Sequence, residues 1–349
     1  MSLYRSARPI LFLVPAEAAH RIFGLLLRLP LPWAELSGAR DLPSIPTELA
    51  GLRLANPVGL AAGFDKDARG VRGLSAMGFG YLVVGTVTRA PRAGNPKPRV
   101  VRLPDRRSLV NAMGLPNHGA QAVADRLRAL RRRTPILASI ADEAPDDVEA
   151  NHRALEPWVD GFELNASCPN VRWGRDADDE SHLRALVTTL VSRRARPDAP
   201  LFVKLPPFVT ASERDAVLAL AAVAQDAGAD GLTCSNTLPV PEPRISVGRG
   251  GLSGAALTER TPGIVADVRR ATGEAMPINA CGGISGPAAA RACLEAGATT
   301  VQLYTGLVYE GPRVVRSIVR GLAVSPGTGA ARPPAQQVGE RARWAPAEP

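Results

Sequence analysis

The sequence predicts an α/β protein: a closed (β/α)8 TIM barrel preceded by a two-helix N-terminal extension. Two observations lead to this prediction. Eight short, almost continuously apolar runs occur between residues 58 and 303, and stretches with helical periodicity separate them. Strands that are apolar along their whole length are typical of parallel sheets covered by helices on the outside. Eight successive strand–helix units in one chain indicate a barrel.

The expected strands lie in the order that a barrel requires. They cover residues 58–61, 81–85, 136–140, 161–164, 201–204, 231–234, 278–280 and 300–303. Helical patterns between them include 120–131, 182–194, 213–227 and 286–296. We therefore assign residues 43–323 to the barrel, a normal size for this fold. Residues 324–349 are rich in Pro, Gly, Ala and Arg, and we expect them to form a disordered tail.

Residues 1–42 differ from the rest of the chain. Two short segments of helical character carry an apolar face, with Arg5, Arg8, Arg21 and Arg28 around it. The apolar run over 10–15 has only six residues, short of the ~7–15 of a signal peptide and of the ~20 that span a bilayer. An interfacial membrane anchor is expected, and a helix pair packed on the next domain is the alternative.

Composition restricts the possible functions. Four cysteines without CxxC spacing predict neither a disulfide framework nor a metal site, and favour a reducing compartment. The net charge of +9 comes without interleaved basic and aromatic residues, so we expect attraction to an anionic membrane surface rather than to nucleic acid. Of the 42 basic residues, 39 are arginine. The lysines, Lys66, Lys97 and Lys204, are therefore candidates for sites that need a compact ammonium.

Polar side chains gather after the strand at 161–164. Asn165, Ser167, Cys168 and Asn170 follow it, and Pro169 closes the loop. Polar groups at the carboxyl end of a parallel strand indicate an active site, and carboxamides suit a flat ligand with neighbouring C=O and N–H groups. The alternatives are a turn-forming asparagine and an inert buried cysteine.

Glycine-rich turns follow the strands at 278–280 and 300–303. Residues 281–285 read CGGIS, and Tyr304, Thr305 and Gly306 follow the last strand. Such turns after the seventh and eighth strands form the usual phosphate site of TIM barrels. Together with Lys66 and Lys204 at strand ends, they predict a phosphorylated planar cofactor across the barrel mouth.

At this point the chain resembles the dihydroorotate dehydrogenases, which are flavin enzymes of pyrimidine synthesis. The resemblance covers roughly residues 4–320 and lies in GLAAGFDKD (59–67), GFGYLVVGTVT (78–88), GNPKPRVVRL (94–103), VNAMG (110–114), NASCPN (165–170), SNT (235–237), GGLSG (250–254) and CGGIS (281–285). Residues 11–23, LFLVPAEAAHRIF, resemble the N-terminal segment of the membrane-associated, quinone-reducing class (class 2).

The resemblance implies oxidation of dihydroorotate to orotate, with FMN as cofactor, a respiratory quinone as acceptor, and peripheral attachment to the cytoplasmic face of the cell membrane. It implies FMN contacts from Ala62, Gly63, Thr86, Ser139, Asn165, Lys204, Ser235, Gly254, Gly283, Tyr304 and Thr305. It implies substrate contacts from Lys66, Asn111, Asn165, Asn170, Asn236 and Thr237, and a quinone path along His20 and Arg102. Cys168 would be the catalytic base, and no metal is expected.

Three positions depart from the family pattern. Cys168 stands where the quinone class usually has serine, as in the soluble class that passes electrons to fumarate or NAD. Ser139 replaces an asparagine and is followed by Ala141 and Asp142 instead of a Gly-Lys pair, and residues 112–116 (AMGLP) lack the usual Arg, Phe and Asn. Two alternatives therefore stay open: a soluble dihydroorotate or dihydropyrimidine oxidoreductase, and a flavin-binding barrel without turnover.

Overall fold

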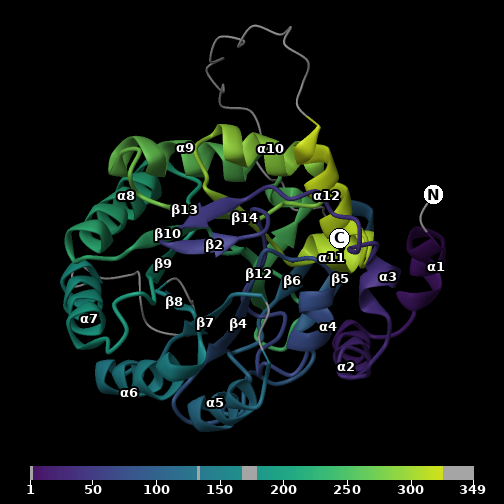
Figure 1. Ribbon diagram of the computed structural model, residues 1–349, viewed down its shortest axis with the longest axis horizontal. Helices are drawn as coiled ribbons and strands as arrows, with labels where there is room; N and C mark the ends of the chain where they lie inside the picture. The colour runs from purple at the N-terminus through teal and green to yellow at the C-terminus, as the bar shows by residue number, and fades with distance from the viewer. Residues whose placement is uncertain (1–2, 132–133, 167–178, 325–349) are drawn as a thin grey trace, which may run out of the picture.

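Eight parallel strands close into a barrel at the centre of the molecule (Figure 1). The computed structural model describes residues 3–131, 134–166 and 179–324. Around the barrel the strands are β3 (Val58–Leu60), β4 (Tyr81–Val87), β7 (Ile136–Ile140), β8 (Gly161–Leu164), β9 (Leu201–Leu205), β10 (Gly231–Cys234), β13 (Ile278–Cys281) and β14 (Thr300–Leu303). β14 pairs with β3 and completes the ring, with Val301 opposite Val58. The TIM barrel and its eight strands are confirmed.

Helices cover the outside of the barrel, and a large apolar core fills the space between the two layers. They are α4 (Val71–Ala76), α5 (Ala120–Arg128), α6 (Pro145–Leu155), α7 (Asp179–Arg193), α8 (Ala211–Asp226), α9 (Arg260–Thr272), α10 (Pro287–Glu295) and α12 (Val314–Ala323). α8 begins with a capping box, in which the side chains of Thr210 and Glu213 each accept from the other residue's backbone N–H. The end of α5 at Arg128 is three residues earlier than its periodicity predicts.

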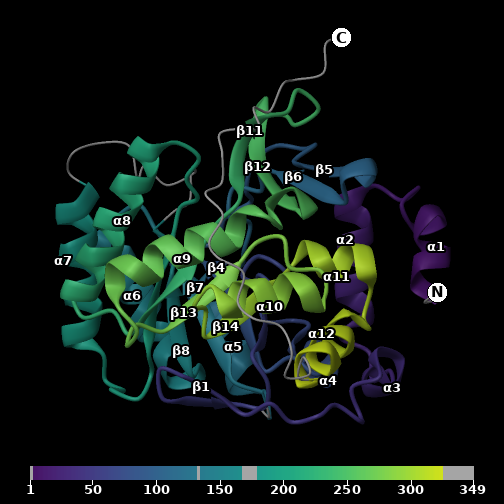
Figure 2. The ribbon, with the colours of Figure 1, turned by 90° about the horizontal axis from the view of Figure 1, so that it is seen from above.

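Aromatic side chains fill the lower end of the barrel. Tyr81 and Phe202 are fully buried inside it, beside Leu49 of the β1–β2 hairpin (Thr47–Leu49 and Leu52–Leu54), which closes that end (Figure 2). A Cβ on Gly59 would lie 2.3 Å from the Tyr81 ring, so a strand glycine makes room for it. The lower half of the barrel is therefore a packed core, and an opening can lie only at the other end.

A small antiparallel sheet lies over that other end (Figure 2). Its order is β11 (Leu238–Pro241), β12 (Arg249–Gly254), β6 (Ser108–Asn111) and β5 (Val100–Leu103). The sequence analysis did not predict these strands, because β11 contains two prolines and β12 three glycines. Pairing of Gly251 with Asn111 carries residues from two distant segments to the barrel mouth.

The N-terminal extension contains the two expected helices, α1 (Leu3–Leu11) and α2 (Ala16–Leu26), and adds a short third, α3 (Trp33–Ser37). α1 lies against α11 (Thr305–Glu310), as Figure 1 shows. The Tyr4 hydroxyl donates to the Val308 carbonyl at 2.6 Å, and the Arg8 guanidinium donates to the Tyr309 carbonyl at 3.0 Å. Arg5 and Arg107 both pair with the buried Glu310 carboxylate.

Arg102 holds the connection between α1 and α2. Its guanidinium donates to the carbonyls of Val14 at 2.6 Å and Phe12 at 3.2 Å, and it lies 4.5 Å from the centre of the Phe12 ring. Within the described ranges, no helix is long and apolar enough to cross a bilayer. The extension is thus fixed to the barrel by polar contacts of α1 and the α1–α2 connection, and by Leu27 and Trp33, which are buried in the main core.

We predict that Gly311→Ala detaches α1 and leaves the barrel folded. Gly311 has φ +78°, and an added Cβ would lie 2.4 Å from the Tyr4 ring. Limited trypsin digestion should cleave within residues 1–15 about tenfold faster than in the wild type. Gly273→Ala is the matched control, because Gly273 also has φ +78° but nothing lies within 4 Å of its Cβ position. Equal cleavage of both variants would contradict the attachment described here.

Candidate active site

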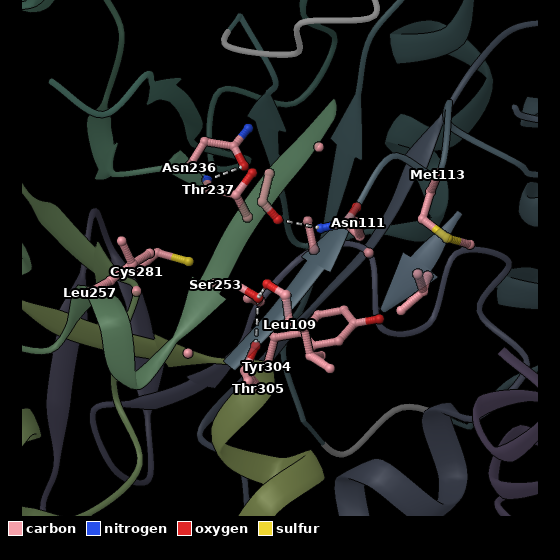
Figure 3. A pocket seen from close by; sticks show the side chains of 18 of the residues that line it. Leu109, Asn111, Met113, Asn236, Thr237, Ser253, Leu257, Cys281, Tyr304 and Thr305 are labelled. Carbon is pink, nitrogen blue, oxygen red and sulfur yellow. Dashed lines mark hydrogen bonds between the residues drawn. The ribbon is translucent and has the colours of Figure 1, made fainter. Parts of the chain in front are cut away.

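One cavity of about 370 Å³ lies at the carboxyl ends of the barrel strands, beneath the small sheet (Figure 3). Most of the site residues expected from the sequence line it. They are Ala62, Gly63, Lys66, Thr86, Asn111, Asn165, Lys204, Ser235, Asn236, Thr237, Gly254, Gly283, Tyr304 and Thr305. These residues are spread over more than 240 positions of the chain, and closure of the barrel brings them together.

The charged groups that line this cavity are all basic within the part of the chain that the structure describes. Lys66, Arg107, Lys204 and Arg249 line it, and no carboxylate does. A cavity walled by cations with low-dielectric surroundings concentrates anions. Its ligands are therefore expected to carry negative charge.

Lys204 on β9 is the most enclosed of these cations, with 5% of its surface exposed. Its Nζ lies 3.3 Å from the Glu163 carboxylate on the neighbouring strand β8. Burial is the largest single effect and lowers the pKa of this ammonium, but the Glu163 charge, the Cys281 thiol and the hydrogen bond to Glu163 together outweigh it, so the pKa of Lys204 is raised above its ordinary value. Lys204 is therefore a fixed positive charge at the cavity wall.

Lys66 follows β3 and reaches the cavity from a different side. Its ammonium donates to the Gly63 carbonyl at 2.6 Å. Burial, and then repulsion by Arg99, lower the pKa of Lys66 to about 8. An anion bound beside Lys66 would relieve both effects, which is the behaviour expected of a ligand-binding cation.

Side-chain amides and hydroxyls supply the neutral polar groups. Asn165 donates to the Thr86 hydroxyl at 3.1 Å, and the Asn236 carboxamide oxygen accepts from the Thr237 backbone N–H at 2.8 Å. Asn111 lies across the cavity on β6 (Figure 3). Ser139 differs from the expectation in its position: it is fully buried behind Thr86, 3.0 Å from that hydroxyl, and does not line the cavity. Any influence of Ser139 on a ligand passes through Thr86.

Glycine turns form the end of the cavity next to α11. A Cβ on Gly283 would lie 2.3 Å from the Thr258 backbone nitrogen, and a Cβ on Gly254 would lie 2.5 Å from the Arg107 carbonyl oxygen. The Ser253 and Thr305 hydroxyls are 2.9 Å apart beside these turns (Figure 3). Close backbone approach with two hydroxyls is what a phosphate group requires.

A series of aromatic rings connects the cavity to α2. His20 on α2 lies 5.2 Å from the Phe64 ring centre and 6.4 Å from that of Tyr304, which lines the cavity. Burial lowers the pKa of His20 to about 4, so the imidazole is neutral. Arg102 lies at the α1–α2 connection, where it donates to the Val14 carbonyl.

A second cavity, about 640 Å³, lies between α2 and the barrel. His20 lines it together with Arg21 and Arg28, whereas Lys66 and Met113 line both cavities. The two spaces are therefore neighbours separated by side chains. The sequence analysis did not predict that Phe64 and Met113 line these cavities. The available signal was their place in the chain, since Phe64 directly precedes Asp65 and Met113 closely follows Asn111.

Cys168 and Asn170 lie outside the described residues. The thiols of Cys234 and Cys293 are buried, and burial raises the pKa of each to about 12. Among the described residues no group of three His, Cys, Asp or Glu side chains could hold a metal ion.

Comparison with known proteins supports one family. The sequence profile described as Dihydroorotate dehydrogenase matches residues 44–325. The chain is 40% identical over 345 residues to the dihydroorotate dehydrogenase (quinone) of Salinispora arenicola, covering 91% of this chain and 98% of that protein. It is 39% identical over 334 residues to the protein of the same name from Parvibaculum lavamentivorans, covering 93% of this chain and 94% of that one.

A solved structure agrees. The crystal structure of DHODH from Eimeria tenella in complex with ferulenol superposes with a TM-score of 0.77 at 32% identity, over 88% of this chain and 90% of that one. Profile, sequence and structure cover the barrel, and the sequence relatives extend into the N-terminal helices. This chain therefore belongs to the dihydroorotate dehydrogenase family.

Proposed function

We propose that this protein oxidises dihydroorotate to orotate in pyrimidine biosynthesis, with FMN as its cofactor and a respiratory quinone as the electron acceptor. The observation that carries the proposal is the cavity lined by four cations and, among the described residues, no carboxylate. It matches two anionic groups, a substrate carboxylate and a cofactor phosphate. The relatives named dihydroorotate dehydrogenase (quinone) support both the substrate and the acceptor.

The cavity residues fit FMN. A volume of about 370 Å³ falls in the usual range for a cofactor site, roughly 300–1,000 Å³. The glycine turns at Gly254 and Gly283 suit the phosphate, and Lys204 suits the pyrimidine edge of the ring. The Gln302 side-chain oxygen is buried without a partner in the described structure and lines the same cavity, which favours a ligand that donates a hydrogen bond. When bound, FMN supplies the hydride acceptor.

Lys66 and the carboxamides would hold the substrate. The ammonium of Lys66 neutralises the dihydroorotate carboxylate, and Asn111, Asn165 and Asn236 line the cavity with donors and acceptors for the ring imide. Asn170 would complete this set according to the sequence pattern. Binding between these groups fixes the orientation of the ring and excludes water from it.

Cys168 would take the proton from C5 of the substrate as a thiolate. A free thiol titrates near ~8.5, within reach of physiological pH, and a nearby cation such as Lys66 lowers that value. A serine hydroxyl is a much weaker acid and needs a proton relay. The thiol is also the base of the soluble class, so the acceptor has to be tested separately.

The first 42 residues favour the quinone over fumarate or NAD. Nine of the twelve exposed large apolar side chains of the described structure lie there, including Leu13, Leu25 and Leu29. Exposed Arg21 and Arg28 flank them, as in helices that lie in a membrane interface. His20 then lies between the lipid-facing helices and the cavity. We infer peripheral attachment to the cytoplasmic face of the cell membrane, with quinone entering along α2.

Anaerobic spectroscopy tests the function. The purified protein should show an FMN absorption band that dihydroorotate bleaches under nitrogen. A quinone should restore the band, whereas fumarate and NAD should not. Restoration by fumarate or NAD alone would select the soluble class, and a band that dihydroorotate leaves unchanged would select a barrel without turnover.

A substitution at the glycine turn should weaken FMN binding. In Gly283→Ala the new Cβ would overlap the Thr258 backbone and displace the glycine turn, so the Kd for FMN should rise at least tenfold. Gly286→Ala in the same turn is the control, since nothing lies within 4 Å of its Cβ position. Fluorescence titration of the flavin-free protein measures both. Unchanged affinity in Gly283→Ala would place the phosphate elsewhere.

Orotate binding should depend on the protonation of Lys66. An anion prefers the ammonium, so affinity should be constant below pH 8 and should fall by up to about tenfold per pH unit above it. Lys66→Arg should remove this pH dependence and lower turnover by about an order of magnitude or more, because a planar cation cannot replace a point charge. Lys97→Arg should behave as the wild type, since Lys97 makes a half-exposed pair with Glu17. Calorimetric titration with orotate at several pH values measures these affinities, and an affinity of the wild type that does not change above pH 8 would contradict the role of Lys66.

Variants at Cys168 should separate proton removal from binding. The rate of flavin reduction should rise with pH through one ionisation in the thiol range and then level. Cys168→Ser should slow reduction, and Cys168→Ala should nearly stop it while FMN and orotate still bind. Iodoacetamide should alkylate Cys168 in preference to Cys234, Cys281 and Cys293, and orotate should protect it. An alanine variant that reduces its flavin at the wild-type rate would place the base elsewhere.

A charge on the apolar surface should abolish membrane attachment. Leu25→Asp should prevent co-flotation with vesicles of anionic phospholipid and lower turnover with a long-chain quinone, while dihydroorotate still bleaches the flavin. Val209→Asp is the matched control, because Val209 and Leu25 are both 53% exposed and Val209 lies outside the extension. Flotation of both variants at the wild-type level would show that α2 does not meet the lipid.

A further inference from the structure

We propose that Glu163 is a positioning residue for the flavin site, which it serves by holding the Lys204 ammonium charged and fixed at the cavity wall. The inference rests on the proposed flavin function of the cavity. Glu163 itself does not line that cavity; it lies inside the barrel, directly behind Lys204. A lone carboxylate in an otherwise apolar strand is costly to bury, so its contacts show what it does there.

Side chains from three other strands of the barrel meet at the Glu163 carboxylate, whose residue has no exposed surface. Lys204 of β9 lies 3.3 Å from one oxygen, and the Thr233 hydroxyl of β10 donates to the other at 2.9 Å. The amide nitrogen of Gln302 on β14 is 3.5 Å from that second oxygen. All three neighbours present hydrogens to the carboxylate.

A buried chain of hydrogen bonds runs through the barrel to Glu163. The Tyr81 hydroxyl lies 2.7 Å from that of Thr300, which donates to the Asn279 carboxamide oxygen at 2.6 Å. The Asn279 amide nitrogen lies 3.3 Å from the Thr233 hydroxyl, which donates to Glu163. The Tyr81 hydroxyl also lies 3.3 Å from the Asn279 carboxamide oxygen, so hydrogens run from Tyr81 and Thr300 toward Asn279 whichever of the two hydroxyls donates to the other. Every donor in the chain therefore points toward the carboxylate.

This direction assigns charges to the pair. An acceptor of several donors is an ionised carboxylate, because a protonated one would place a hydrogen against its donor neighbours. An ionised Glu163 in turn keeps Lys204 protonated in a site that would otherwise favour the neutral amine. Among the described residues, the other titratable group that acts on Lys204 is Cys281 on β13, whose thiol is held neutral because burial raises its pKa.

The Glu163–Lys204 pair gives the cavity a cation whose charge does not vary with pH. Lys204 lies nearer to the cavity than Glu163, so its positive charge acts more strongly on a bound ring than the carboxylate does. A fixed ammonium at that edge favours negative charge on the ring and raises the midpoint potential of bound FMN. Without Glu163, the buried ammonium loses its counterion and its pKa falls by several units.

The midpoint potential of bound FMN, measured against reference dyes from pH 6 to pH 10, tests this role. In Glu163→Gln the potential should show a new break where Lys204 loses its proton, with values below the wild type on the alkaline side of the break. Glu163→Asp should restore the wild-type profile in part. In a Lys204→Met background, Glu163→Gln should add no break.

Glu156→Gln is the control for loss of a buried carboxylate. Glu156 is 4% exposed, accepts from the Arg196 backbone N–H at 2.8 Å and lies away from the cavity, so its loss should lower stability without changing the potential profile. A wild-type profile in Glu163→Gln would overturn the proposal. If Glu163→Gln does not fold, Thr233→Val takes its place, because this variant removes one hydrogen bond to Glu163 and keeps both charges. A smaller change of the potential profile in the same direction supports the role of Glu163. An unchanged profile overturns the proposal.

In this measurement a chemical reductant such as dithionite reduces the flavin in equilibrium with the dye, without dihydroorotate. The potential therefore reports on Glu163 even in a protein that fails to oxidise dihydroorotate, and the two proposals can fail separately.

Discussion

Eight parallel strands form a stable closed barrel only if side chains fill its interior, and here the filling changes in character from one end to the other. Tyr81, Phe202 and the β1–β2 hairpin form an apolar layer at the lower end. A middle layer of hydroxyls and amides leads to the Glu163–Lys204 ion pair. Only the upper end is open, and there the strand ends surround a basic cavity. The position of the site thus follows from how the barrel is filled.

Polar groups can be buried in the middle layer because they form hydrogen bonds with one another. An isolated charge inside the barrel would cost several kcal/mol, whereas an ion pair with further hydrogen bonds offsets much of that cost. The same arrangement holds a cation beside the cavity without exposing it to water. Packing and function are therefore served by the same residues in this part of the barrel.

The N-terminal extension obeys a different constraint. Helix α1 and the α1–α2 connection are bound to the barrel through contacts of Tyr4, Glu310 and Arg102, while nine large apolar side chains of the extension remain exposed. Between α2 and the cavity lie the rings of His20, Phe64 and Tyr304. Burial keeps His20 neutral, which leaves this passage without an added charge. A row of uncharged rings suits an apolar acceptor better than it suits fumarate or a nicotinamide nucleotide.

Continuous apolar runs made the eight barrel strands predictable, because burial on both faces demands them. The small sheet was missed, since β11 and β12 are rich in Pro and Gly and obtain their pairing from distant strands. Motif order predicted most of the cavity lining, although the roles of those residues remain proposals. Ser139 lies behind Thr86 and does not line the cavity, and its expected contact with FMN stays a prediction. The place of Arg107 in the cavity wall could not be predicted from the sequence, because it depends on a left-handed turn and on the ion pair with Glu310.

A crystal structure of the protein with FMN and orotate tests the central claim most directly, namely that one basic cavity holds a phosphorylated flavin beside an anionic substrate. The account predicts the phosphate at Gly254 and Gly283, the pyrimidine edge of the flavin at Lys204, and the orotate carboxylate at Lys66. An orotate carboxylate bound away from Lys66, or a flavin phosphate outside the glycine turns, would contradict it.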